Sequence, residues 1–280
     1  MRSNLFFSDP VAGGERCPPL GDVALNHGFA RAVLEGLAPG RLWVDDLSSP
    51  HVAHVVHHYG MSLVWGDRTA SDSLIEHLRA GDYRSEDEWL QIDPHWTSVN
   101  WDERLGAAPY DPDAPAVGPQ VQRFNRVNFR FDKGLFLARP AAPPLPEGWS
   151  LRLASERDLA LTGMGVAPSA FWRDAGQFIA KGGGVCAVKD GAVGAIAFVS
   201  FRFDNELEIG IETRMPYRGL GLARAVAVAI IQRCLADELE PIWACRRENA
   251  ASFSLALQLG FIETKNLPYY RLPARSGKHP

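Results

Sequence analysis

The sequence predicts a mixed α/β (α+β) protein built from two parts. Its 280 residues are about twice the length of an ordinary domain. Two proline clusters, at 109–119 and 140–146, interrupt the chain, and proline-rich segments act as semi-rigid connectors. After the second cluster, three strand patterns joined by Asp-Gly and Asp-Asn turns precede a long apolar helix. This order is typical of a mostly antiparallel sheet flanked by helices.

The proline clusters also define the predicted domains. We expect an N-terminal α/β domain over residues 1–140, a second domain over 147–272, and a flexible tail over 273–280. Each of the two domains is long enough to bury a hydrophobic core of its own.

Composition excludes several classes of protein. Hydrophobic residues make up 46% of the chain and charged residues 22%, as in globular proteins, and the formal net charge is −4. That charge argues against a protein that coats nucleic acid or an anionic membrane. The four cysteines (Cys17, Cys186, Cys234 and Cys245) form no CxxC pair, which argues against a disulfide scaffold and favours a reducing cytoplasm.

The first part alternates between helical and strand patterns. Short β-branched runs bounded by Gly, Pro or Asp predict strands, and apolar residues at helical spacing predict helices. The predicted elements are helices at 30–37 and 71–78, the start of a helix at 86–92, and strands at 41–45, 52–58, 61–65 and 121–131.

Four histidines in this part have a spacing that resembles a metal site: His51, His54, His57 and His58. Successive side chains of a strand point to opposite faces, so these four do not all face one site. No Cys or carboxylate lies at ligand spacing within the run. We therefore predict a sheet face here and no metal.

The second part is more regular. Turn residues separate its strands, and Gly182, Gly183 and Gly260 end its helices. The predicted elements are strands at 149–153, 185–189, 192–203, 206–213, 242–245 and 261–272, and helices after Ser155, at 169–180, at 220–238 and from Asn249 to Gly260.

The segment from Arg218 to Ala223 (Arg-Gly-Leu-Gly-Leu-Ala) carries the chemical signal. It connects a strand to the long helix, and its two glycines let the backbone approach a ligand closely. The helix start offers unpaired N–H groups and the positive end of its dipole, which together suit a pyrophosphate. Arg218 adds a permanent positive charge. An ordinary strand–helix turn is the alternative interpretation.

A second motif follows at the expected distance. The order of strand, Arg-x-x-Gly-x-Ala, long helix, strand, and then Asn249 and Leu259-Gly260-Phe261 resembles the GNAT superfamily of acetyl-CoA-dependent N-acyltransferases. The resemblance covers about residues 147–272. It implies a GNAT fold there, with acetyl-CoA as co-substrate, and tandem chains of the superfamily suggest that the first part is a degenerate GNAT-like half.

A closer resemblance is to a two-part subgroup that includes the zwittermicin A resistance acetyltransferase. The residues that carry it are Glu208–Thr213, Trp243–Cys245 and Leu42–Leu47.

The resemblance implies the residues that bind the cofactor. Backbone amides of Thr213 and Met215 would donate to the pantetheine and acetyl oxygens, and Asn249 and Ser252 would contact CoA. The pyrophosphate would be held by Arg218 and the amides of the loop, namely Gly219, Leu220, Gly221, Leu222 and Ala223.

Catalysis needs a group that removes a proton from the attacking amine. Glu206, Glu208 and Glu212 alternate along one strand and so share a face, and clustered carboxylates are candidates for a general base. Glu212, nearest the loop, is the first choice and Glu208 the second. A solvated sheet face is the alternative.

The sequence departs from the superfamily at the leaving group. Many members place a Tyr seven residues after the Asn, to protonate the thiolate, but here that residue is Ala256. Ser252 lies one helical turn earlier and is the candidate relay. Tyr269 and Tyr270 on the final strand are further candidates, and each of these side chains also has an ordinary structural interpretation.

These inferences together predict an N-acetyltransferase acting on a primary amine of a small molecule, by direct attack in a ternary complex. A CoA-binding regulatory module without turnover is an alternative, as is transfer of a longer acyl group or transfer to a protein N-terminal amine. We expect a monomer or homodimer with no nucleic-acid or membrane partner.

Overall fold

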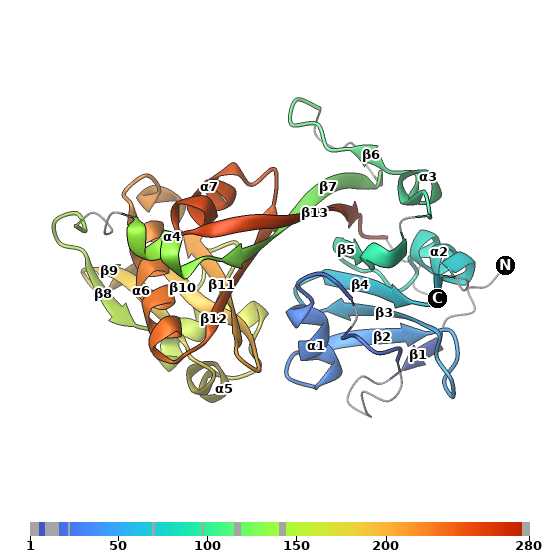
Figure 1. Ribbon diagram of the computed structural model, residues 1–280, viewed down its shortest axis with the longest axis horizontal. Helices are drawn as coiled ribbons and strands as arrows, with labels where there is room; N and C mark the ends of the chain where they lie inside the picture. Colours follow the sequence, from blue (N-terminus) through green and yellow to red (C-terminus); the bar gives the residue numbers. More distant parts are fainter. Residues whose placement is uncertain are drawn as a thin grey trace. The chain divides into compact units, whose positions relative to one another are not determined.

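The structure is a computed structural model that describes residues 6–8, 17–21, 23–68, 71–96, 98–114, 119–139 and 144–275. The described chain divides into two compact units (Figure 1). Unit 1 takes the described residues of 1–127, 246–248 and 265–280, and unit 2 those of 128–245 and 249–264. Residues 140–143 of the predicted linker and 276–280 of the predicted tail lie outside the described residues.

Two long strands give residues to both units. They are β7 (Gln122–Phe131) and β13 (Phe261–Leu272). The two units are defined by packing, whereas the predicted domains 1–140 and 147–272 are defined by the proline connectors. The domain boundaries stay a proposal about which parts of the chain fold independently.

Unit 1 contains a mixed sheet with the strand order β1-β2-β3-β4-β5-β13. Its pairs are antiparallel except for β4 with β5 and the short β6 with β7, which run parallel. Its strands, besides the ends of β7 and β13, are β1 (Phe6–Ser8), β2 (Gly40–Val44), β3 (Val52–His57), β4 (Met61–Gly66), β5 (Glu88–Ile92) and β6 (Ala108–Pro109).

The helices of unit 1 are α1 (Gly28–Leu34), α2 (Ser71–Ala80) and α3 (Trp101–Leu105). The apolar face of α2, formed by Leu74, Ile75 and Leu78, is buried in a core cluster with Trp96 and Trp101. Burial of this apolar face stabilises a helix whose own propensity is modest.

The helix expected to start at Glu86 is wrong, because residues 88–92 form strand β5. Leu90 pairs with Ser62 on one side and with Tyr270 on the other. Backbone pairing with two partners distant in sequence outweighs the local helical pattern of this short segment.

The sheet of unit 2 has the order β12-β11-β10-β9-β8. All of its pairs are antiparallel except β11 and β12. The prediction of a mostly antiparallel sheet flanked by helices is confirmed. Its strands are β8 (Ser150–Leu153), β9 (Gly184–Lys189), β10 (Ala192–Phe203), β11 (Glu206–Thr213) and β12 (Glu240–Arg246).

Helix α6 (Leu222–Ala236) packs against β9, β10 and β11. Figure 1 shows it as the long orange helix along these strands. Its buried residues are Leu222, Ala225, Val226, Ala227, Ile230, Ile231 and Cys234.

The single helix expected at 169–180 is wrong. The chain instead forms a 3₁₀ turn at Pro168–Ala170 and a short helix α5 (Ala175–Ala180). Asp174 is the N-cap of α5, because its carboxylate accepts the Gln177 N–H at 2.6 Å. The remaining helices of unit 2 are α4 (Lys133–Ala138) and α7 (Ala250–Gln258).

Candidate functional site

Strands β11 and β12 pair over a short distance and then separate. Their parallel register covers only Glu206, Leu207 and Glu208, opposite Glu240, Pro241 and Ile242. Strand β11 continues to Thr213 and β12 to Arg246. The backbone edge of β11 beyond Glu208 is therefore not paired with β12, so its polar groups are available to a ligand.

The loop from Arg218 to Ala223 follows the separated end of β11 and leads into α6. Gly219 and Gly221 have φ angles of +81° and +76°, in the left-handed region that favours glycine. A Cβ at either position would meet no described atom within 4 Å. The loop is open to a bound group on this side.

The first turn of α6 begins at this loop. Gly221 is its N-cap, and among the described residues no side chain caps the helix. The positive end of a 15-residue helix, with N–H groups that no side chain satisfies, therefore borders the open loop.

Arg218 turns back toward the end of β11. Its Nη2 lies 3.2 Å from Glu212 Oε1, and its Nε donates to the Thr213 carbonyl at 3.2 Å. The Arg218 side chain is 61% exposed and that of Glu212 is 17% exposed. A surface cation therefore holds a largely buried carboxylate.

The three glutamates of β11 share one face, as the sequence predicts. Leu207 and Ile209 are buried on the other face, and the residues between them are more exposed. Around Gly210, however, the glutamate face is covered, because Phe198 lies against this glycine. A β-bulge between Val199 and Phe201 puts Phe201 opposite Glu208, and both phenylalanines contact Phe171.

Thr213 has one polar group in use and one without a partner. Its backbone N–H donates to Glu212 Oε1 at 3.0 Å, so donation to a substrate oxygen requires that bond to be exchanged. Its buried hydroxyl has no hydrogen-bond partner in the described part of the chain. A buried hydroxyl without a partner is a point where a bound polar molecule gains a hydrogen bond.

Asn249 and Ser252 lie at the start of α7. The Asn249 side-chain oxygen accepts the Ser252 N–H at 3.1 Å, so Asn249 is a helix N-cap, its ordinary structural role. The Ser252 hydroxyl accepts a hydrogen bond from Trp243 Nε1 at 3.2 Å and keeps its own proton to donate. Ala256, one turn further on, is fully buried.

Trp172 and the candidate tyrosines Tyr269 and Tyr270 have structural roles. Trp172 is buried, and its Nε1 donates to the Val199 carbonyl at 2.6 Å. Tyr269 and Tyr270 belong to unit 1, not to unit 2. Tyr270 donates to Asp102 at 2.8 Å, and burial raises the pKa of Tyr269 to about 12.

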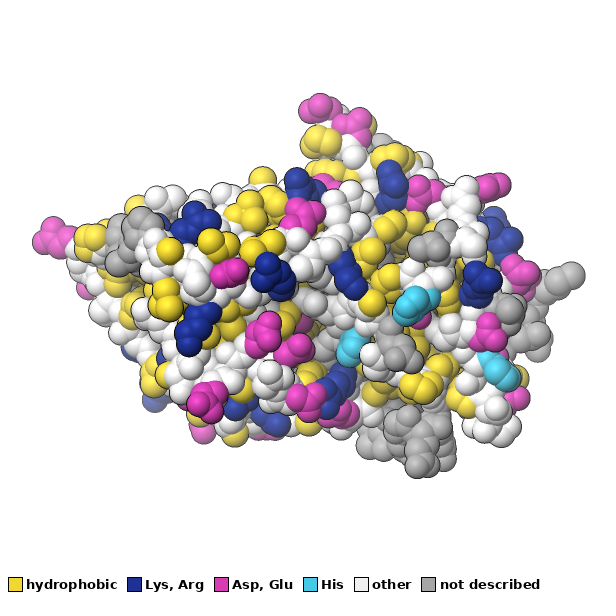
Figure 2. All heavy atoms as spheres, in the orientation of Figure 1, with side chains coloured by type: hydrophobic (Ala, Val, Ile, Leu, Met, Phe, Trp, Pro, Cys, Tyr) yellow, Lys and Arg dark blue, Asp and Glu magenta, His cyan; other side chains and the backbone are white. Residues whose placement is uncertain are grey.

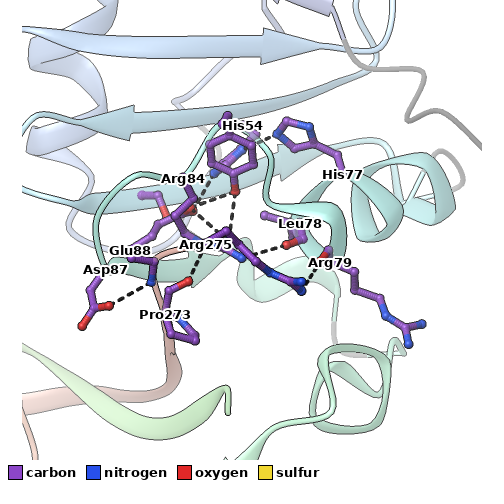
Figure 3. A network of polar contacts seen from close by, with 12 residues as sticks. His54, His77, Leu78, Arg79, Arg84, Asp87, Glu88, Pro273 and Arg275 are labelled. Atoms are coloured by element: carbon purple, nitrogen blue, oxygen red, sulfur yellow. Dashed lines mark hydrogen bonds and ion pairs between the residues drawn. The ribbon is translucent and has the colours of Figure 1, made fainter. Parts of the chain in front are cut away.

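Sequence reasoning missed a buried polar network in unit 1, shown in Figure 3. Glu88 accepts from His54 Nε2 at 2.8 Å, Ser62 at 2.6 Å and Tyr83 at 2.8 Å. The other ring nitrogen of His54 lies 3.2 Å from His77 Nε2. Burial raises the pKa of the Glu88 carboxyl, but the nearby His54 and Arg84 outweigh it and lower that pKa to about 2.

This network ties several segments of unit 1 together. Arg84 donates to the carbonyls of Leu78 and Pro273, and so joins α2 to the segment after β13. Because His54 and His77 lie 23 residues apart and Glu88 lies 34 residues from His54, their meeting leaves no local sequence signal. His54 and His57 both lie in strand β3, and both are fully buried.

Unit 1 also has two surface pockets, each of about 510 Å³. Trp96 contributes to both, and in the second the carboxylate of Asp102 is already held by Tyr270 and by Arg123. Among the described residues, no group of three His, Cys, Asp or Glu side chains is placed to hold a metal ion.

The face drawn in Figure 2 has no dominant charge. Figure 2 shows Lys and Arg interspersed with Asp and Glu over the face in view. Within the described ranges, no helix has the length and apolar character needed to cross a bilayer.

The fold, the separated strands and the glycine loop define an acyltransferase of the acetyl-CoA-dependent type. The family described as GNAT acetyltransferase matches residues 24–270, so the chain belongs to that family. Its members use acetyl-CoA as acyl donor, and the open loop, the uncapped α6 and the unpartnered Thr213 hydroxyl fit that group. The zwittermicin-like subgroup stays a prediction.

Individual relatives support this assignment. The Bacillus subtilis (strain 168) protein YdfB, described as an uncharacterized N-acetyltransferase, is 27% identical over 83% of this chain and 85% of its own. A GCN5-related N-acetyltransferase-like protein from Streptococcus suis 89/1591 has a similar structure, with a TM-score of 0.62 and 25% identity over 85% of this chain and 90% of its own.

A tandem GNAT protein from the clavulanic acid biosynthesis pathway shares the fold over both parts. Its TM-score is 0.55 at 15% identity, and the similarity covers 98% of this chain and all of that one (100%).

Proposed function

We propose that this chain transfers the acetyl group of acetyl-CoA to a primary amine of a small molecule, by direct attack within a ternary complex. The observation that carries the proposal is the separation of β11 from β12 beside an open glycine loop. It leaves the backbone edge of β11 beyond Glu208 without pairing to β12, next to the start of α6. Preorganised donors at a developing oxyanion contribute about 2.7–4 kcal/mol each to catalysis in other enzymes.

The proposed cofactor residues keep the roles that the family resemblance implies. Arg218 and the amides of Gly219, Leu220, Gly221, Leu222 and Ala223 bind the pyrophosphate. The amides of Thr213 and Met215 donate to the pantetheine and acetyl oxygens, and Asn249 and Ser252 contact CoA at the start of α7. We propose that this takes place in the cytoplasm.

Glu212 is the proposed general base. A free alkyl amine resembling Lys has a pKa near 10, so it is mostly protonated at neutral pH and must lose a proton before it attacks. Glu212 lies next to Thr213, the proposed donor to the acetyl oxygen, and Glu208 is the second candidate on the same face. Water protonates the leaving thiolate, with the Ser252 hydroxyl as relay, because the family's Tyr is replaced by buried Ala256.

Thiol release from acetyl-CoA against a panel of small amines tests this function. We expect Glu212→Gln to lower kcat by about 10²-fold or more, the usual contribution of a general base, without weaker acetyl-CoA binding. Glu206→Gln is the matched control, because it removes one negative charge from the exposed end of the same strand. Equal activity of Glu212→Gln and the wild type would exclude Glu212 as the base.

The same assay separates the rival functions. Calorimetric binding of acetyl-CoA without thiol release for any amine would indicate a binding module. Absence of acetyl-CoA binding would exclude the proposed activity altogether.

A further inference from the structure

One guanidinium serves two groups in this site. Arg218 contacts Glu212 Oε1 and the Thr213 carbonyl, each at 3.2 Å. The same side chain is the only permanent cation in the loop from Arg218 to Ala223. When the Arg218 guanidinium contacts Glu212, it lies against strand β11 and not over the glycines of the loop.

The carboxylate of Glu212 is correspondingly occupied. Oε1 accepts both the Thr213 N–H at 3.0 Å and the Arg218 Nη2 at 3.2 Å, which uses both lone pairs of that oxygen. Its second oxygen lies beside Gly165, where an added Cβ would be 3.3 Å away. While both bonds are in place, Oε1 has no lone pair left to receive a proton from an amine.

A diphosphate competes for the same donors. The planar fork of Arg matches phosphate oxygens as well as it matches a carboxylate, and a diphosphate carries more charge than Glu212. The Arg218–Glu212 ion pair is more than half exposed on the arginine side, and such pairs contribute only about 0–1 kcal/mol. The pair is therefore weak enough to be exchanged when a stronger anion arrives.

We propose that Arg218 acts as a latch on Glu212. In the free protein the Arg218 guanidinium holds the Glu212 carboxylate. The guanidinium releases this carboxylate when it turns to the CoA pyrophosphate. This rests on the proposed function, whose cofactor and base it links. No bond is formed or broken covalently in this exchange. It frees one lone pair of Oε1 of Glu212 when the cofactor binds, so deprotonation of the amine at this oxygen follows acetyl-CoA binding.

Calorimetric titration of the full chain with CoA tests the latch without any turnover. In the wild type, part of the binding free energy is used to break the Arg218–Glu212 pair. We expect Glu212→Gln to tighten CoA binding by about two- to fivefold, the ratio that corresponds to a weak surface pair. Glu212→Ala, which also removes the carboxylate, is expected to give the same change.

Two controls separate the latch from a general effect of charge. Glu206→Gln removes a negative charge from the same strand and is expected to leave the CoA Kd within about 1.5-fold of wild type. Glu206 lies at the opposite end of β11 from Glu212, and salt screens the interaction of exposed charges that are far apart. In an Arg218→Gln background CoA binds more weakly, and Glu212→Gln is expected to cause no further change, because the latch has already been removed.

Each outcome is decisive. Unchanged or weaker CoA binding in both Glu212 variants overturns the latch, and so does tightening that persists in the Arg218→Gln background. If the wild type binds no CoA, the proposed cofactor site itself is wrong, and that result differs from a wild type that binds CoA but shows no coupling between Arg218 and Glu212.

Discussion

Gly210 shows how a single residue positions the glutamate face. It lies between Glu208 and Glu212 on β11 and is paired with Phe198 on β10. A Cβ at this position would lie 2.5 Å from Cζ of Phe198 and 2.7 Å from Oγ of Ser200. The absence of a side chain lets the Phe198 ring approach the strand closely between the two proposed catalytic carboxylates.

A Gly210→Ala substitution is therefore expected to destabilise the protein by about 1–3 kcal/mol through overpacking. Gly21→Ala is the control, because a Cβ there meets no described atom within 4 Å. Urea unfolding measures both variants. Equal stability of the two would contradict the packing that places Phe198 on Gly210.

The sequence indicates the shared face of the three glutamates better than the partners of these glutamates. Alternation along 206–212 predicts that Glu206, Glu208 and Glu212 share a face, and the burial of Leu207 and Ile209 agrees. The pairing of Glu212 with Arg218 was not predicted, because it depends on how the chain turns between them.

At the scale of one element, the loop before α6 combines a left-handed backbone conformation with an open surface. Gly221 has a φ of +76° and Gly191, in the turn between β9 and β10, has a φ of +78°. A Cβ on either glycine meets no described atom within 4 Å. The two glycines are therefore matched in conformation and in space, and differ in whether a ligand is proposed beside them.

We expect Gly221→Ala and Gly191→Ala to lose similar stability, about 1–2 kcal/mol, because an L-residue is strained at positive φ. Only Gly221→Ala is expected to weaken CoA binding, by about tenfold or more, because its Cβ occupies the space into which the pyrophosphate would fit. Melting temperatures and calorimetric Kd values for both variants test this. Equal CoA affinities would place the cofactor elsewhere.

Elements with a strong local pattern were predicted well, and those fixed by distant partners were not. The strands within 185–213 are joined by the predicted Asp-Gly and Asp-Asn turns. Asp190 and Asp204 have positive φ in these turns, a conformation that Asp tolerates better than most residues. By contrast, strand β5 depends on pairing with β4 and β13, and Pro168 and Asp174 divide the segment expected as one helix.

At the scale of the whole molecule, buried histidines determine the response to acid. Burial lowers the pKa of His57 to about 4 and that of His77 to about 3, from 6.5 in both cases. Both stay neutral in the folded chain while the unfolded chain takes up protons below pH 6.5. Stability is therefore expected to fall as pH decreases from 6.5 toward 4 for His57 and toward 3 for His77.

For each of these two histidines, we expect the free energy of unfolding to be about 2 kcal/mol lower at pH 5 than at pH 7.5. Glu88 adds a further loss only between pH 4.5 and about 2, because its pKa is lowered on folding. Urea unfolding at pH 7.5 and pH 5 measures the difference.

His77→Gln is expected to reduce that difference by about 2 kcal/mol, because it removes one of the two groups. The exposed His51 provides the control variant, His51→Gln. An unchanged pH dependence in His77→Gln would show that His77 is not kept neutral by the fold.

The overall architecture was accessible from the sequence only in part. The family of the second part could be predicted from two motifs, the loop of Arg218–Ala223 and the later Asn249 with Leu259-Gly260-Phe261. The network around Glu88, by contrast, joins residues from β3, β4, β5 and α2 that share no sequence motif. A buried carboxylate held by several distant donors is visible only once the chain is folded.

Strand β13 has a consequence for synthesis. Its first residues belong to unit 2, whereas Lys265–Leu272 complete the sheet of unit 1, whose other strands begin at Phe6. A ribosome therefore makes most of unit 1 first but must translate past Leu272 before that sheet has its last strand. Until then the edge of β5 that pairs with β13 lacks that partner, and an unpaired strand edge is open to pairing with other chains.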